Sequence, residues 1–193
     1  MMITLTGFMG SGKTTVGKVL ADFLGCPFWD LDDLVVKKAG KSIPEIFAQD
    51  GEPAFRELEA RLLRQTVEKY AESTAVLALG GGAILAPASA ALLRDKTVCI
   101  YLRATLDTLL ARLAGETAGR PLLQEIPDQV GDDGSGQARN NDGPVVMPGP
   151  DRASVAARLA ARAPLYEETA HVTIDTDGLS PDEVADEIII SAL

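Results

Sequence analysis

Two patterns of apolar residues alternate along the chain. Short, mostly apolar runs predict buried strands. These runs are residues 3–6, 28–29, 75–79, 97–102 and 171–175. Between them, apolar residues recur every three or four positions, as in amphipathic helices. The predicted helices are residues 13–24, 32–39, 52–70, 105–114 and 180–190, with a short helix after Ser42.

Strands alternating with helices predict an α/β fold, because parallel strands need helical crossovers that cover both faces of the sheet. We therefore expect one domain over residues 1–193, with three layers and a central parallel sheet of about five strands. Residues 125–150 differ, since they are dense in Gly, Asp, Asn and Pro and have few apolar side chains. We expect a flexible loop there.

Composition excludes several classes of function. The formal net charge of −10 disfavours nucleic-acid binding, because an acidic surface repels phosphates. One histidine and two distant cysteines, Cys26 and Cys99, are too few for a zinc site. No apolar run reaches the roughly 18 residues of a membrane span, and we expect no secretory signal. We therefore predict a cytoplasmic protein without membrane contact.

The segment from Gly7 to Thr14 reads GFMGSGKT, which matches the Walker A pattern GxxxxGK[ST] between a predicted strand and a predicted helix. Glycines let successive backbone N–H groups point at phosphate oxygens, and the helix N-terminus adds positive potential. Lys13 would reach the β- and γ-phosphates of ATP, and the Thr14 hydroxyl would ligate Mg²⁺. The residues predicted to hold the nucleotide here are Gly10, Ser11, Gly12, Lys13, Thr14 and Thr15.

Asp30 and Asp32 follow the second predicted strand, at the sheet edge where ligands bind in α/β folds. One carboxylate could hold Mg²⁺ and the other could accept a proton from an attacking hydroxyl. The alternative is that Asp32 or Asp33 caps the next helix and compensates its dipole. No aspartate ends the strand before the glycine run, so Asp30 is the candidate metal ligand.

Arg56 and Glu59 share one face of a predicted helix. They form either a surface ion pair or an arginine oriented for bidentate contact with a substrate carboxylate. The run Gly80–Gly82 is either a loose turn or a backbone that another group approaches closely.

These motifs together make the chain resemble the shikimate kinases. The Walker A loop, DxD, FRxxE, GGG, RPLL and RxPLY occur in that family's order over nearly the whole chain, except for the stretch from Glu125 to Pro150. The resemblance implies transfer of the ATP γ-phosphate to the 3-hydroxyl of shikimate, with Mg²⁺, in aromatic amino-acid biosynthesis. We expect a monomer.

The resemblance assigns roles to particular residues. Asp32 would bind shikimate and act as general base, with Lys13 and Arg120 as the other catalytic residues. The substrate would be bound by Asp32, Arg56, Glu59, Gly80, Gly81, Gly82 and Arg162, and the metal by Thr14 and Asp30. Arg120 would close over the phosphates. Arg112 would pack against adenine, although a solvated helix face explains it equally well.

The resemblance further implies a shikimate-binding helical region at about 31–71 and a lid at about 112–152. The stretch from Glu125 to Pro150 departs from the family as an insertion, which either slows lid closure or has no effect. Two other functions stay open. One is a kinase for gluconate or a nucleoside monophosphate, and the other is a nucleotide-binding regulatory module without catalysis.

Overall fold

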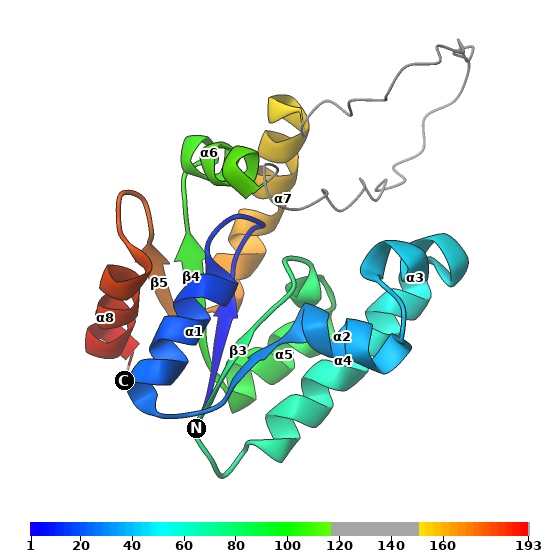
Figure 1. The fold of residues 1–193 in the computed structure, drawn as a ribbon, viewed down its shortest axis with the longest axis horizontal. Coiled ribbons are helices and arrows are strands. Elements are labelled where there is room, and N and C mark those ends of the chain that lie inside the picture. Colours follow the sequence, from blue (N-terminus) through cyan, green and yellow to red (C-terminus); the bar gives the residue numbers. More distant parts are fainter. Residues whose placement is uncertain (117–150, 193) are drawn as a thin grey trace.

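The computed structural model describes residues 1–116 and 151–192. Among these residues, five strands form one parallel sheet in the order β2-β3-β1-β4-β5 (Figure 1). The strands are β1 (Met2–Thr6), β2 (Phe28–Asp30), β3 (Ala75–Ala78), β4 (Val98–Arg103) and β5 (Val172–Asp175). The predicted α/β class and strand number are confirmed.

Helices cover both faces of the sheet. They are α1 (Lys13–Leu24), α2 (Leu31–Ala39), α3 (Ile43–Gln49), α4 (Gly51–Lys69), α5 (Pro87–Lys96), α6 (Leu106–Glu116), α7 (Arg152–Thr169) and α8 (Pro181–Ala192), with a short 3₁₀ turn η1 (Ala83–Leu85). Helices α1 and α8 lie side by side on one face, and α4, α5 and α7 lie on the other (Figure 1).

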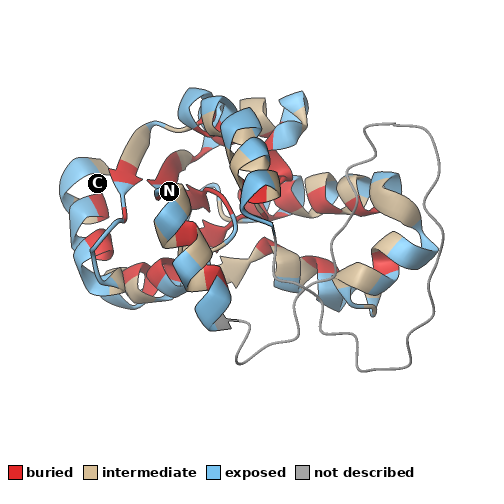
Figure 2. Cartoon of the chain, turned by 90° about the horizontal axis from the view of Figure 1, so that it is seen from above, coloured by how far each residue is buried: buried red, intermediate tan, exposed pale blue. Residues whose placement is uncertain are grey.

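The core divides into two layers because side chains alternate along each strand. In β1 and β4, Ile3, Leu5 and Ile100 face α1 and α8, whereas Met2 and Tyr101 face α4, α5 and α7. Buried residues therefore concentrate on the strands and the inner helix faces (Figure 2). A sheet buried on both faces explains why the strands read as continuous apolar runs.

Local signals in the sequence set several helix ends. Gly25 and Gly40 end α1 and α2 in the left-handed conformation. The predicted capping box is present at α3, where Ser42 and Glu45 bond reciprocally. The sequence therefore predicted correctly where α1 and α2 end and where α3 begins.

Three features were not predicted. Helix α5 was not predicted because it is weakly amphipathic. Helix α7 was not predicted because it contains Pro164, a residue that normally argues against a helix interior. Phe23, which shares the helical spacing of the apolar residues Val16 and Leu20 in α1, is 67% exposed although both of those residues are buried. The described residues contain no helix long and apolar enough to cross a membrane.

Candidate active site

The parallel sheet brings five loops to one edge, because the carboxyl ends of all its strands point the same way. The Walker A loop follows β1, Asp30 ends β2, and the glycine run follows β3. This edge therefore gathers the predicted nucleotide and substrate residues from separate parts of the chain.

The Walker A loop wraps around the start of α1. Gly7 adopts φ 145°, and a Cβ there would lie 2.6 Å from the carbonyl oxygen of Leu102, so only glycine fits. Gly12 precedes α1 without a side-chain cap, which leaves the N-terminal N–H groups of the helix available to an anion. Lys13 Nζ donates to the carbonyl oxygens of Gly7 and Phe8, both at 2.9 Å.

Two hydroxyls of this loop fit a phosphate and metal site. The Ser11 hydroxyl is buried and has no hydrogen-bond partner among the described residues. The Thr14 hydroxyl donates to Asp30 Oδ2 at 2.7 Å. A hydroxyl beside a carboxylate is an oxygen donor pair of the kind Mg²⁺ prefers. Thr15 is exposed in the first turn of α1.

Asp30 also settles the capping alternative. Its Oδ1 accepts from the Asp32 backbone N–H at 3.0 Å, so Asp30 itself is the N-cap of α2. The alternative that Asp32 or Asp33 provides this cap is wrong, although both lie in the first turn of α2, where they compensate the helix dipole. The Asp32 side chain is thereby released from local capping and faces the sheet edge, within reach of Gly80.

Asp32 is an unusual carboxyl group. Burial, together with the negative charge of the neighbouring Asp30, raises the pKa of Asp32 to about 6, against the opposing effect of Lys13 and Arg56. A pKa in this range leaves the group mainly ionised at neutral pH, yet able to accept a proton.

Arg56 lies between two carboxylates of α4. Its Nη1 donates to Glu59 Oε2 at 2.9 Å, and its Nε and Nη2 donate to Glu52 Oε1 at 3.2 and 3.1 Å. Glu59 is only 5% exposed, so the surface ion pair left open by the sequence is wrong. Burial raises the pKa of Glu59, and Arg56 opposes that shift.

The glycine run packs directly against these side chains. A Cβ on Gly80 would lie 2.7 Å from Asp32 Oδ1 and 2.9 Å from Glu59 Oε1. A Cβ on Gly82 would lie 2.6 Å from Arg56 Nη1. Gly81 faces the Walker A loop, since its Cβ would lie 3.6 Å from the Gly7 carbonyl oxygen. The loose-turn alternative is wrong, because this backbone is closely approached from both sides.

Helix α7 joins the site through Tyr166, whose hydroxyl donates to the carbonyl oxygen of Gly81. Tyr166 is fully buried and stacks on Tyr101, with ring centroids 5.0 Å apart. Burial raises the pKa of Tyr166 to about 12, and Arg162, which interacts with its hydroxyl, opposes the shift. Arg162 therefore interacts with the hydroxyl that bonds Gly81, while Arg56 lies directly against Gly82.

Arg112 connects the Walker A loop to the end of β5. Its guanidinium donates to the Ser11 carbonyl at 3.3 Å and to the Thr176 carbonyl at 2.7 Å. A solvated helix face therefore does not describe Arg112. Its contact with adenine stays a prediction, and its guanidinium borders the nucleotide loop.

Arg120, the RPLL motif and the stretch from Glu125 to Pro150 lie outside the described residues. Sequence reasoning assigned no role to Glu52 or Tyr166. Glu52 stands four residues before Arg56, a spacing that places both on one helix face. Tyr166 lies within the quoted RxPLY motif, but nothing in the sequence shows that its hydroxyl reaches Gly81.

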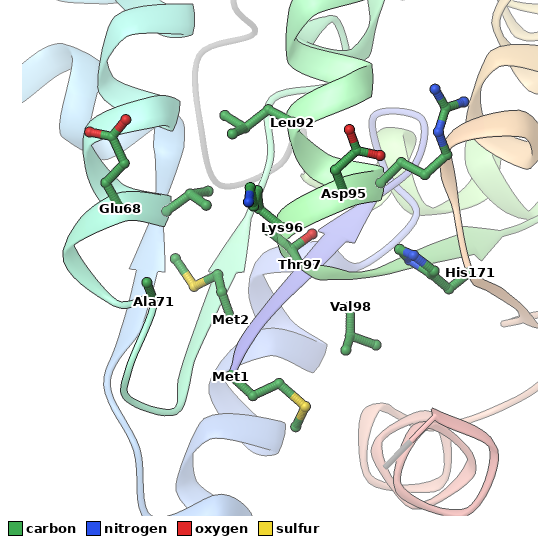
Figure 3. A pocket seen from close by; sticks show the side chains of 12 residues that line it. Met1, Met2, Glu68, Ala71, Leu92, Asp95, Lys96, Thr97, Val98 and His171 are labelled. Carbon is green, nitrogen blue, oxygen red and sulfur yellow. The ribbon is translucent and has the colours of Figure 1, made fainter.

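A separate hollow lies at the opposite edge of the sheet. It has a volume of about 680 Å³ and is lined by the starts of β1 and β4, including Met2 and Val98, and by His171 (Figure 3). The candidate site lies at the carboxyl edge, where ligands bind in parallel sheets. This hollow lies at the amino edge and is therefore separate from the candidate site.

Comparisons with known proteins agree with this geometry. The family model for shikimate kinase matches residues 9–192. A shikimate kinase of Salinibacter ruber is 44% identical over 177 residues, covering 92% of this chain and 78% of that protein. One of Enterococcus faecalis is 37% identical over 188 residues, covering 97% and 95%.

Solved structures give the same result. The shikimate kinase of Acinetobacter baumannii in complex with shikimate has a TM-score of 0.76 and 33% identity, covering 97% of this chain and 90% of that one. The enzyme of Bacteroides thetaiotaomicron has a TM-score of 0.76 and 28% identity, covering 97% and 95%.

Proposed function

The chain belongs to the shikimate kinase family, and we propose that the residues gathered at the carboxyl edge of its sheet carry out that family's reaction. The enzyme transfers the γ-phosphate of ATP to the 3-hydroxyl of shikimate, which gives 3-phosphoshikimate and ADP. One observation carries the assignment of residues. The run Gly80–Gly82 touches Asp32, Glu59 and Arg56 on one side and the Walker A loop on the other.

The acceptor site lies along the glycine run. Arg56 of α4 lies against Gly82, and Arg162 of α7 interacts with the Tyr166 hydroxyl that bonds Gly81, so the two guanidinium groups are suited to hold one carboxylate between them. Glu59 is nearly fully buried and fixes Arg56 from behind. We assign shikimate binding to Asp32, Arg56, Glu59, Gly80, Gly81, Gly82 and Arg162.

The donor site lies in the Walker A loop. The N–H groups at the start of α1 and the Lys13 ammonium would bind the β- and γ-phosphates. Thr14 and Asp30 would hold Mg²⁺, which neutralises phosphate charge when bound. Arg112 borders this loop, and Arg120 is assigned to the phosphates from the family resemblance alone.

Asp32 is assigned as the general base. Its carboxylate would accept the proton of the 3-hydroxyl as that oxygen bonds to the γ-phosphorus and the bond to ADP breaks. Burial keeps the pKa of Asp32 near 6, so the ionised form is present at neutral pH and still basic enough to take a proton. Positioning and charge stabilisation supply the rest of the catalysis.

An ADP-release assay with ATP and Mg²⁺ tests the function. Shikimate should support turnover, and gluconate and nucleoside monophosphates should not. Arg56→Ala should raise the KM for shikimate about 10- to 100-fold with little change in the KM for ATP, because a charge-assisted contact is lost. Arg61→Ala, at an exposed position of the same helix, is the matched control. Equal turnover with another acceptor would refute the assignment.

We further propose that the enzyme is a cytoplasmic monomer. In support of the monomer, the assigned residues that the structure describes gather at one edge of a single sheet, so the proposed site can be built within one chain. In support of the location, ATP is a cytoplasmic metabolite. Sedimentation of the purified protein would test the monomer, since a mass above 20.3 kDa would contradict it.

A further inference from the structure

Arg56 has two carboxylate partners that differ in what holds them. Glu59 is 5% exposed and sits behind Gly80, whereas Glu52 is 39% exposed. A buried carboxylate loses its only compensation if it leaves its arginine, but a half-exposed carboxylate exchanges that contact for water at little cost. Glu52 is therefore the partner that can be displaced.

Glu52 also occupies the edge of Arg56 that is best suited to a carboxylate. Its Oε1 accepts from both Nε and Nη2, at 3.2 and 3.1 Å, while Glu59 bonds only to Nη1. The Nε and Nη2 hydrogens form one side of the guanidinium fork, which matches the two oxygens of a carboxylate. A substrate carboxylate that uses this side has to replace Glu52.

We propose that Glu52 is a specificity-determining residue that competes with the substrate carboxylate for Arg56. Before substrate arrives, Glu52 keeps the guanidinium extended over Gly82 and screens its charge. When the substrate binds, its carboxylate takes the Nε and Nη2 contacts and Glu52 turns to water. Glu52 thereby weakens substrate binding and disfavours acids that offer only a weak, single-oxygen contact. The inference rests on the proposed function of the Arg56 site.

The charges around Arg56 also indicate that Glu52 weakens substrate binding. With Glu52 and Glu59 both ionised, the two carboxylates more than offset the single positive charge of Arg56 before an anion enters. Replacing Glu52 by glutamine keeps the size of the side chain, removes its charge and makes the site more attractive to an anion. A residue that only positioned Arg56 would have the opposite effect, because its loss would free the arginine side chain.

The test is the steady-state kinetics of Glu52→Gln and Glu52→Ala with shikimate and ATP. Both should lower the KM for shikimate by about two- to fivefold, the range expected for loss of a half-exposed ion pair, with kcat and the KM for ATP unchanged. Glu57→Gln, an exposed change of equal charge on the same helix, should leave the KM for shikimate within error.

The outcomes separate the two proposals. Absence of shikimate turnover in the wild-type protein would refute the proposed function itself. Wild-type turnover with a KM that is unchanged or raised in Glu52→Gln would refute only the competition by Glu52. An equal fall in KM in Glu57→Gln would also refute it, because the effect would then follow net charge rather than contact with Arg56. In an Arg56→Ala background, the fall caused by Glu52→Gln should shrink to the level of the Glu57→Gln control.

Discussion

Gly82 lies directly against Arg56, so closely that a Cβ on Gly82 would come within 2.6 Å of Arg56 Nη1 and 2.8 Å of Nη2. No real side chain tolerates such a separation, and the guanidinium would have to move. A glycine at this position therefore lets Arg56 keep its observed place, and the backbone φ of Gly82, at −106°, is not the reason for the glycine.

Gly82→Ala should consequently raise the KM for shikimate by about 10- to 100-fold, because it displaces a group that positions the substrate by an ångström or more. The KM for ATP should change little, since the Walker A loop faces Gly81 instead. Gly115→Ala is the control, because a Cβ there meets nothing within 4 Å. Steady-state kinetics measures both, and an unchanged KM for shikimate in Gly82→Ala would place the substrate elsewhere.

Asp32→Asn should lower kcat by at least about 10²-fold, the usual contribution of a general base. The activity of the wild-type enzyme should depend on pH, because it requires the ionised form of Asp32. Burial raises the pKa of Asp32 to about 6, so kcat/KM should fall as the pH drops through that value and the carboxylate becomes protonated. A pH–rate profile that is flat from pH 7 to pH 5 would remove Asp32 from the mechanism.

The same raised pKa predicts that Asp32 destabilises the folded enzyme at neutral pH. The folded state holds the Asp32 proton up to about pH 6, whereas the unfolded chain releases it near pH 4. The protonated group thus favours folding at low pH, and that contribution is lost as the pH rises through 6. Asp32→Asn should therefore be more stable than wild type at pH 7, by on the order of 2 kcal/mol.

Thermal melts at pH 7 and at pH 4 measure this difference. The gain in Tm for Asp32→Asn should be clear at pH 7 and should be nearly absent at pH 4, where the wild-type carboxyl is itself protonated. Asp33→Asn, at an exposed position in the same helical turn, is the control and should show no such gain. Loss of Tm in Asp32→Asn at pH 7 would contradict the destabilising role of the buried charge.

The sequence predicted the parts of this fold that local chemistry determines. The Walker A glycines, the stops at Gly25 and Gly40, and the Ser42–Glu45 box act within a few residues, so their effects are readable along the chain. Helix α7 was missed because Pro164 lies inside it, and the packing of Val155 and Tyr166 in the core overrides that signal.

The candidate site was likewise predicted only in part. Residue types and spacing were enough to select Asp32, Arg56 and the glycine run as candidates. They could not decide between a surface pair and a buried one, because the burial of Glu59 is set by packing against Gly80, on another element. They also missed Tyr166, whose hydroxyl reaches a carbonyl 85 residues away.

Tyr166→Phe should test whether that hydrogen bond positions the substrate loop. Removing the hydroxyl leaves the Gly81 carbonyl without this donor, and a buried hydrogen bond contributes about 0.5–1.5 kcal/mol. We expect a two- to tenfold rise in the KM for shikimate and a small fall in Tm. Tyr101→Phe, which removes the hydroxyl of the stacked partner ring, is the control. A fall in Tm without any change in KM would indicate a purely structural role.

The pairing of Thr14 with Asp30 predicts how the enzyme depends on Mg²⁺. Asp30 has two separable tasks, since Oδ2 accepts from Thr14 and Oδ1 caps α2. Asparagine caps helices as well as aspartate does, so Asp30→Asn should keep α2 and Asp32 in place while it removes the negative charge beside Thr14. The Mg²⁺ concentration needed for half-maximal activity should therefore rise about 10-fold or more, because a charged oxygen ligand is replaced by a neutral one. Titration of activity with Mg²⁺ at saturating ATP and shikimate measures this shift, and circular dichroism checks that the helices are retained. If Asp30→Asn were active at the wild-type Mg²⁺ concentration, the metal would have to be held without the Asp30 charge.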